Sequence, residues 1–219
     1  MKALLIKDWK LLKNQGGYFS TVFLIVIMIM CIGSADTAGF IISYMTFLFS
    51  VFVLSTLSYD SYDNGMAFLM SFPVDRKTYI AEKYIFAIFL SLGSWLASIL
   101  LRLVFFFIFQ TPEGDVTEFI YSSPMFLMMA LIFLGYSLPI HLKYGSEKGN
   151  ILSFGILGAA CFGTFLFLRI TDSTELIRLF QNITDKDFGS LMAGMAGFCI
   201  IFWGISYGIS LRIMVKKEF

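Results

Sequence analysis

Histidine and cysteine are the residue types with which a chain holds a metal ion or carries out nucleophilic chemistry, and this sequence has few of either. His141 is the only histidine, and Cys31, Cys161 and Cys199 all lie in apolar stretches without a Cys-x-x-Cys pair. A zinc site needs clustered ligands, and an intramembrane metalloprotease needs paired histidines with a carboxylate. We therefore expect no metal in this chain, and cysteines that act as small buried apolar residues.

Sequence motifs for catalysis and nucleotide binding are also missing. The sequence has neither a Gly-x-Ser-x-Gly nucleophile elbow nor the Gly-x-x-x-x-Gly-Lys-[Ser/Thr] loop that cradles nucleotide phosphates. Its net charge of +1 gives no basic face for nucleic acid. We therefore expect a chain that is not an enzyme and that binds neither a cofactor nor nucleic acid.

Ionisable side chains are almost lacking within the apolar stretches, and Arg102 is the one candidate. A charge inside a membrane usually pairs with another group or marks a transport path. Arg102 follows Tyr84, where its apolar stretch begins, by roughly 18 residues. Two interpretations stay open: the side chain snorkels to the outer interface, or it has a functional or pairing role.

The composition indicates the kind of fold that positions these residues. Of 219 residues, 58% are hydrophobic and only 14% are charged, whereas a soluble domain usually carries about 25% charged residues. So little polar surface cannot cover a water-soluble particle of this size, and we expect lipid to cover the rest. The sequence therefore predicts an all-α integral membrane protein with one transmembrane domain, residues 1–219.

Six apolar stretches can cross a bilayer, whose core of about 30 Å needs about 20 apolar residues in a helix. Backbone groups in lipid must be satisfied within the segment, which forces these stretches to be helical. The predicted spans are residues 18–34, 38–57, 84–109, 124–142, 151–168 and 188–211.

The distribution of basic residues orients these six spans. Twelve of the 16 lysines and arginines fall on the side that holds both termini and the loops after the second and fourth spans. The positive-inside rule therefore places the N-terminus and the C-terminus in the cytoplasm.

Three segments outside the spans are expected to be helical. Residues 1–17 are predicted to form an interfacial helix in the inner leaflet, with lysines that meet anionic lipid; the alternative is a frayed basic tail. One face of that helix would be apolar and the opposite face basic, with Met1, Leu5, Trp9 and Leu12 against Lys7 and Lys10. A second short amphipathic helix is expected on the outer side, near Leu176–Phe180, after a capping-box pattern.

The third segment is the longest cytoplasmic loop, from Ser58 to Lys83. It holds an apolar patch, Met66–Met70, between the acidic Asp60 and Asp63 and a break at Pro73. Asp75 is predicted to cap the helix that leads into the third span.

This loop resembles the corresponding segment of small ABC-2-type ABC transporter permeases. In that family an acidic stretch with glycine leads to an apolar run ending in Pro-Val, and a basic helix start follows. Here Asp60, Asp63 and Gly65 stand in the first part, Leu69–Val74 forms the second, and Asp75–Tyr84 the third. Asp75 replaces the serine that is more usual in the family, and either residue can cap. The basic opening and the short basic end, Arg212–Phe219, are also similar to the family.

The resemblance implies the membrane half of an ATP-driven exporter in a bacterial plasma membrane. Two permeases, identical or homologous, would pair with two copies of a separate ATPase that binds ATP and Mg²⁺. The short loop helix, about Asn64–Ser71, would be a coupling helix that docks in a groove of the ATPase. Its coupling residues would be Asp63, Gly65, Met66, Phe68, Leu69, Met70 and Pro73. The alternative is that this patch rests on the membrane or on the N-terminal helix.

Transport by alternating access is the mechanism that the resemblance implies. An interior rich in Phe and Met suits amphipathic or lipophilic cargo such as peptides. Permeases that export membrane-active peptides are similar in size and pattern. Two other classes stay open: a stand-alone channel or secondary transporter, and a non-transporting membrane scaffold or immunity protein. A channel would need polar or ionisable residues along its path, which the spans almost lack.

Overall fold

The computed structural model describes residues 2–32, 37–62, 65–72, 74–109, 113–170 and 173–217. Within these ranges every regular element is an α-helix. The helices are α1 (Lys2–Asn14), α2 (Gly16–Ile32), α3 (Thr37–Ser61), α4 (Gly65–Met70), α5 (Arg76–Phe109), α6 (Glu113–Tyr144), α7 (Ser146–Ile170) and α8 (Ser173–Lys216).

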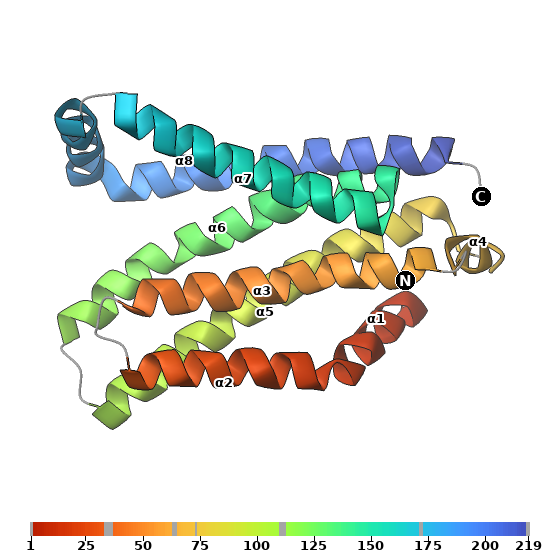
Figure 1. Cartoon of the computed structure of the whole chain (residues 1–219), viewed down its shortest axis with the longest axis horizontal. Helices are drawn as coiled ribbons and strands as arrows, with labels where there is room; N and C mark the ends of the chain where they lie inside the picture. The colour runs from red at the N-terminus through yellow and green to blue at the C-terminus, as the bar shows by residue number, and fades with distance from the viewer. Residues whose placement is uncertain are drawn as a thin grey trace.

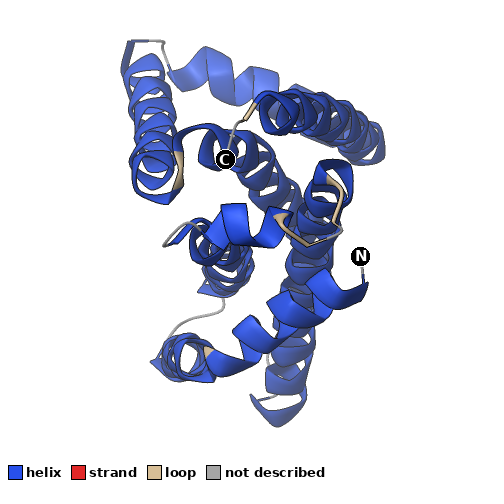
Figure 2. Cartoon of the chain, turned by 90° about the vertical axis from the view of Figure 1, so that its right-hand side faces the viewer, coloured by secondary structure: helices blue, strands red, loops and turns tan. Residues whose placement is uncertain are grey.

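The long helices form a bundle along one axis, and both termini lie at the same end of it (Figure 1). The short helix α4 lies at this end too, and Figure 2 views the end directly. We call it the terminal end of the bundle. The first part of α8 lies across the direction of its remainder (Figure 1). It contains the segment near Leu176–Phe180 for which a separate outer helix is predicted, and the side chains of that segment lie outside the described residues.

Several helices are long and apolar enough to cross a membrane. In the described residues these are α5, α6, α7 and α8, and the pair α1 and α2, bent by 59° at its junction, would make a fifth span. At 1.5 Å per residue, the 34 residues of α5 span roughly 50 Å, which exceeds a bilayer core of about 30 Å. The chain is therefore a helical multi-pass membrane bundle with four to five candidate spans, and the six-span arrangement stays a prediction.

The apolar core is concentrated at the terminal end, where α3, α5, α6 and α8 meet. Phe52, Leu57, Ile80, Leu134 and Met214 are among its buried members. Hydrogen bonds join the helices there as well, because the Tyr84 hydroxyl lies 2.6 Å from Ser206 Oγ and 2.8 Å from Ser210 Oγ. Polar contacts of this kind hold membrane helices together where the lipid offers no hydrophobic driving force.

The helices α6 and α8 pack closely against each other at Gly135. A Cβ atom there would lie 2.7 Å from Cε1 of Phe202. The Gly135 carbonyl accepts a hydrogen bond from Ser206, and the Leu131 carbonyl accepts one from Trp203 Nε1 at 2.9 Å. Glycine therefore fits the packing at this position, since a side chain there would have to displace the Phe202 ring.

The connection between α6 and α7 is a single residue, Gly145, with φ of 81°. This left-handed conformation is open to glycine at little cost. The tight turn brings the start of α7 back against α6, where Gly149 packs on His141. Beyond this turn α7 is largely exposed in the single chain.

Candidate functional site

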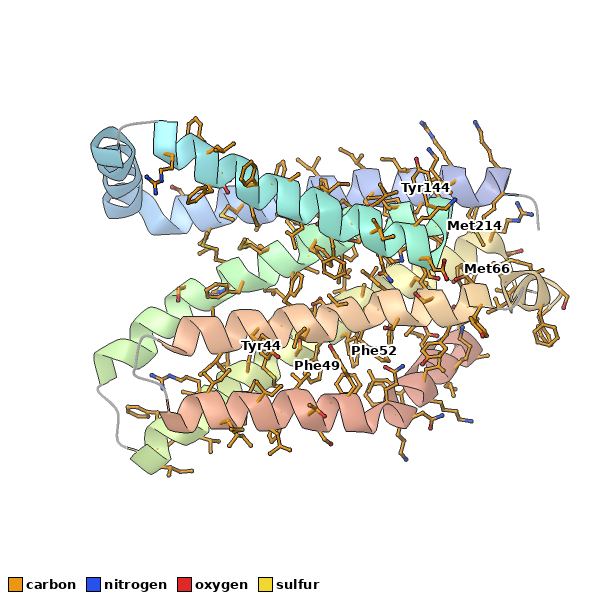
Figure 3. All side chains as sticks on the ribbon, viewed as in Figure 1. Tyr44, Phe49, Phe52, Met66, Tyr144 and Met214 are labelled. Carbon is orange, nitrogen blue, oxygen red and sulfur yellow. The ribbon has the colours of Figure 1, made fainter. Side chains whose placement is uncertain are left out.

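The helix α4 lies where the coupling helix is predicted, at Gly65–Met70 rather than about Asn64–Ser71. Met66 is 7% exposed and belongs to the core, and Figure 3 places it close to Met214 at the terminal end. Leu69 and Met70 are half-buried against the same core. The helix is therefore anchored to the bundle by one face.

The other face of α4 is open. Phe68 is 68% exposed, and Phe72, two residues after the helix, is 52% exposed. Their rings contact each other edge to face, with centroids 5.1 Å apart. Two neighbouring exposed aromatic rings are an apolar surface of the kind that docks in a groove of a partner.

The other residues predicted to contact an ATPase are only partly placed. Gly65 sits so close to the end of α3 that a Cβ atom would lie 3.0 Å from the Asp60 carbonyl oxygen. This close approach connects α4 to α3. Asp63 and Pro73 lie outside the described residues.

Beside α4, a buried cluster of charges joins three helices. Lys83 of α5 lies with its Nζ 2.5 Å from Oδ2 of Asp8 in α1 and 2.8 Å from Oδ2 of Asp60 in α3. Its ammonium also donates to Thr56 Oγ1 at 3.2 Å. The Lys83 side chain is 2% exposed and that of Asp8 is 0% exposed. A buried charge of this kind is tolerated only when opposite charges and hydrogen bonds satisfy it.

Asp60 is the second acid of this cluster and has three partners. Besides Lys83, it accepts hydrogen bonds from Lys7 of α1 and, at 3.0 Å, from the Tyr79 hydroxyl of α5. Burial alone would raise the pKa of Asp60, but Lys83 and Lys7 outweigh burial and hold the pKa below its ordinary value. Asp60 is therefore ionised at neutral pH.

Glu82, the neighbour of Lys83, adds a third carboxyl group to the cluster. It is completely buried, and its carboxyl group lies within hydrogen-bonding reach of that of Asp8. The two lysines already balance the two aspartates, so an ionised Glu82 would leave one buried negative charge uncompensated. We therefore expect Glu82 to carry a proton.

Two basic residues connect the C-terminal part of α8 to α5 and α6 at the terminal end of the bundle. Arg76, the first residue of α5, donates to the carbonyls of Met214 and Val215 at 2.9 and 2.8 Å. Lys217 donates to the carbonyl of Leu142, near the end of α6, at 2.9 Å. Basic side chains are favourable there because they satisfy carbonyls at helix C-termini.

The segment predicted to form an interfacial helix, residues 1–17, contains α1, which runs from Lys2 to Asn14, and its position at the membrane interface stays a prediction. Trp9 and Lys10 are exposed, as expected for residues that face lipid and headgroups, and Trp9 packs edge to face on Phe89 of α5. Lys7 differs from the expectation, because its ammonium contacts Asp60 and Asp8 in the cluster. The face of α1 that packs on the bundle is centred on Leu4 and Asp8.

Away from the terminal end, a cavity of about 290 Å³ lies between α3, α6 and α7. Its walls are almost entirely apolar and mostly aromatic or methionine. They are formed by Tyr44, Phe47, Phe126, Met129, Ala130, Phe133 and Leu157. Figure 3 shows Tyr44 part of the way along α3.

A second cavity, of about 430 Å³, lies nearer the terminal end, and each of its lining residues carries a polar side-chain group. These residues are Gln15, Ser55, Ser58, Tyr59, Tyr62, Ser146 and Asn150. The two cavities share helix faces: on α3, residues 44, 47, 55, 58 and 62 recur at helical spacing, and on α7 so do residues 146, 150 and 157. They therefore lie one after the other along the boundary of α3 and α7, as two separate cavities, and we call the pair the α3–α7 groove.

Arg102 lies on α5, 19 residues beyond Lys83, and therefore roughly 28 Å away along the helix. Its side chain is 7% exposed, so it is enclosed by the bundle. Three buried serines, Ser91, Ser94 and Ser98, lead to it along one face of α5. The role of Arg102 stays a prediction.

Metal binding finds no support in the described residues, where no three His, Cys, Asp or Glu side chains gather around a common point. His141 is buried against Gly149. The charge cluster is the part of the site that sequence patterns did not predict. Its signal was the placement of Asp60 and Lys83 just outside apolar stretches, and of the acidic Asp8 within the basic N-terminal segment.

The chain was compared with protein families, curated proteins and solved structures. A family described as "ABC-2 family transporter protein" matches residues 3–215, which is nearly the whole chain. No curated protein and no solved structure matches it.

Proposed function

We propose that this chain, which belongs to the ABC-2 transporter family, is the membrane-spanning permease subunit of an ATP-driven exporter. Six spans would place both termini and α4 in the cytoplasm of a bacterial plasma membrane. The shared position of the termini and α4 at one end of the bundle supports this orientation. The alternation of inward-facing and outward-facing states would move cargo outward.

The energy for transport would come from a separate ATPase that binds ATP and Mg²⁺. The functional unit would contain two such ATPases and two permeases, the second identical to this chain or homologous to it. The exposed length of α7 leaves a large apolar surface for lipid or for the second permease. ATP binding would draw the ATPases together and push on the α4 helices.

The observation that carries this proposal is the two-sided geometry of α4. Met66 fixes the helix to the core, while Phe68 and Phe72 project from the terminal end. A docking helix needs both properties: exposed anchors bind the groove, and a rigid attachment transmits the push. The close contact between Gly65 of α4 and the Asp60 carbonyl of α3 also attaches α4 to the bundle.

The α3–α7 groove supports an amphipathic or lipophilic cargo. A molecule with a polar head and an apolar body would place its head among Ser55, Ser58 and Asn150, and its body against Phe47 and Met129. Pockets with apolar walls and a few polar groups at one end select ligands of matching polarity. Amphipathic peptides and single-chain lipids both have this character.

Recovery of the partner ATPase from native membranes tests this function. We expect gentle extraction of the tagged wild-type chain to bring down an ATPase, and Phe68→Asp to lose it, because a charge would be forced into an apolar groove. Tyr144→Asp is the matched control, since Tyr144 is an exposed aromatic residue on α6 at the same end. It should retain the ATPase.

The same experiment separates the rival functions. A wild-type chain that brings down no ATPase would favour a stand-alone channel, a secondary transporter or a scaffold. Loss of the ATPase from the Phe68 and Tyr144 variants alike would show that α4 is not the specific docking surface.

A further inference from the structure

The charge cluster contains one residue near each of the two chain segments that connect α4 to the bundle. Asp60 stands near the end of α3, five residues before α4 begins, and Lys83 lies two turns into α5, the helix that follows α4. The third member, Asp8, belongs to α1, which has no chain connection to α4. The cluster therefore links α1 to α3 and α5, the two helices that precede and follow α4 in the chain.

We propose that Lys83 is a positioning residue for transport, which makes α1 move together with the two helices that flank α4. The inference rests on the proposed function, because it assumes that an ATPase pushes on α4. Since Gln15 alone separates α1 from α2, a push on α4 would then reach α2 through the cluster as well as α3 and α5 directly.

Ionic contacts can make α1 move together with α3 and α5 better than the apolar contacts of α1 can. Only Leu4 among the apolar residues of α1 is buried, and Leu5 and Leu12 are half-buried. Apolar side chains can slide past one another with little change in contact area, because the hydrophobic effect has no direction. The Lys83 ammonium, by contrast, is held by Asp8, Asp60 and Thr56 at fixed positions in a buried site.

The position of the cluster makes separation of these helices costly. If α1 stayed behind while α5 moved, Lys83 would lose Asp8 and keep only Asp60, and the buried Asp8 would keep only the partly exposed Lys7. The same holds for Lys7 of α1 and Asp60 of α3. The lowest-energy movement keeps α1, α3 and α5 together at this end.

The distance between α1 and α5 in two nucleotide states tests the proposal. Spin labels would be placed at Lys10 of α1 and Lys77 of α5, both exposed, with the native cysteines replaced and the ATPase bound. We expect the distance distribution in the wild-type background to be the same without nucleotide and with trapped ATP. In Lys83→Met it should shift or broaden when ATP is trapped.

A coupling measurement distinguishes positioning from a merely structural role. In vesicles, uptake of a fluorescent amphipathic helical peptide per ATP hydrolysed should fall about tenfold in Lys83→Met, while ATPase binding and ATP hydrolysis are retained. Lys83→Arg should restore much of the coupling because it keeps the charge and can reach both carboxylates.

Opposite results would overturn the inference. A wild-type α1–α5 distance that changes between the two states would show that α1 does not follow α5, and this holds even if Lys83→Met fails to fold. Unchanged coupling in a folded Lys83→Met would have the same meaning. Failure of the wild-type chain to recover any ATPase would instead overturn the proposed function, and this inference with it.

Discussion

Lys83 and Asp8 are 75 residues apart in sequence, yet Nζ of the lysine lies 2.5 Å from Oδ2 of the aspartate and both side chains are buried. The helix that carries Asp8 has little buried apolar surface of its own. This ion pair therefore fixes the N-terminal helix on the bundle, and the two residues act as one unit.

Removal of one partner of this pair should be more harmful than removal of both. We expect Lys83→Met and Asp8→Leu each to destabilise the protein by about 3–5 kcal/mol, because each leaves the buried cluster of Lys7, Lys83, Asp8 and Asp60 with one uncompensated charge. The double variant should recover part of that loss, since no unpaired charge remains between these two positions. The free energies of unfolding in mixed micelles would measure the cycle, and additive single effects would show that the pair is not coupled.

The low pKa of Asp60 predicts loss of stability in acid. Since its pKa in the folded protein lies below the ordinary value of 3.8, the stabilisation is complete above that value and is lost as the pH falls through the lowered pKa. The groups that face Asp60 are Lys7, Lys83 and Tyr79, with Asp8 and Glu82 in the same cluster. Thermal unfolding between pH 7 and pH 3 should therefore show a steeper acid loss for the wild type than for Asp60→Asn. Equal slopes would contradict the ionic role of Asp60.

The elements of this terminal end were largely predictable from sequence. The resemblance of the loop to ABC-2-type permeases implied a short helix at about Asn64–Ser71, and α4, Gly65–Met70, lies within one residue of it at either end. The apolar stretches predicted helices because lipid-exposed backbone must be hydrogen-bonded within its own segment. Family membership followed from the same loop, and the family match over residues 3–215 confirmed it.

The charge cluster could not be predicted in the same way. Helical periodicity gives the angle of Lys7 on its own helix but not the identity of the helix that faces it. Periodicity assigned Lys7 to a basic side of the helix that faces lipid headgroups. In the fold its ammonium instead donates a hydrogen bond to Asp60, 53 residues away in sequence. Contacts between helices far apart in sequence depend on packing, and a single sequence holds no record of that packing.

The close approach of α6 and α8 predicts opposite effects of two glycine substitutions. Gly135→Ala should destabilise the protein by about 1–3 kcal/mol, because the new methyl group must displace the Phe202 ring. Gly204→Ala is the control on α8, where nothing lies within 4 Å, and it should be neutral or stabilising by up to about 1 kcal/mol. Thermal unfolding of the purified variants measures both. A tolerated Gly135→Ala would mean that Phe202 can rotate away without loss.

The α3–α7 groove predicts that narrowing it blocks cargo but not ATP hydrolysis. Leu157 lines the apolar cavity from α7, so the larger ring in Leu157→Trp should occupy space that the apolar body of the cargo needs. We expect uptake of the amphipathic peptide to fall about tenfold, which corresponds to about 1.4 kcal/mol of lost binding. Leu152→Trp is the matched control, because Leu152 lies on the exposed side of α7, outside both cavities.

The contrast between these two variants decides what fills the groove. If Leu157→Trp lowers uptake and Leu152→Trp does not, with ATPase binding equal in both, the groove lies on the cargo path. If both variants transport normally, the cavity holds only bulk lipid, whose acyl chains would adapt to the new ring at little cost. If both lower uptake together with ATPase binding, the exposed surface of α7 contacts a second permease, and the cargo path must lie elsewhere in the assembled pair.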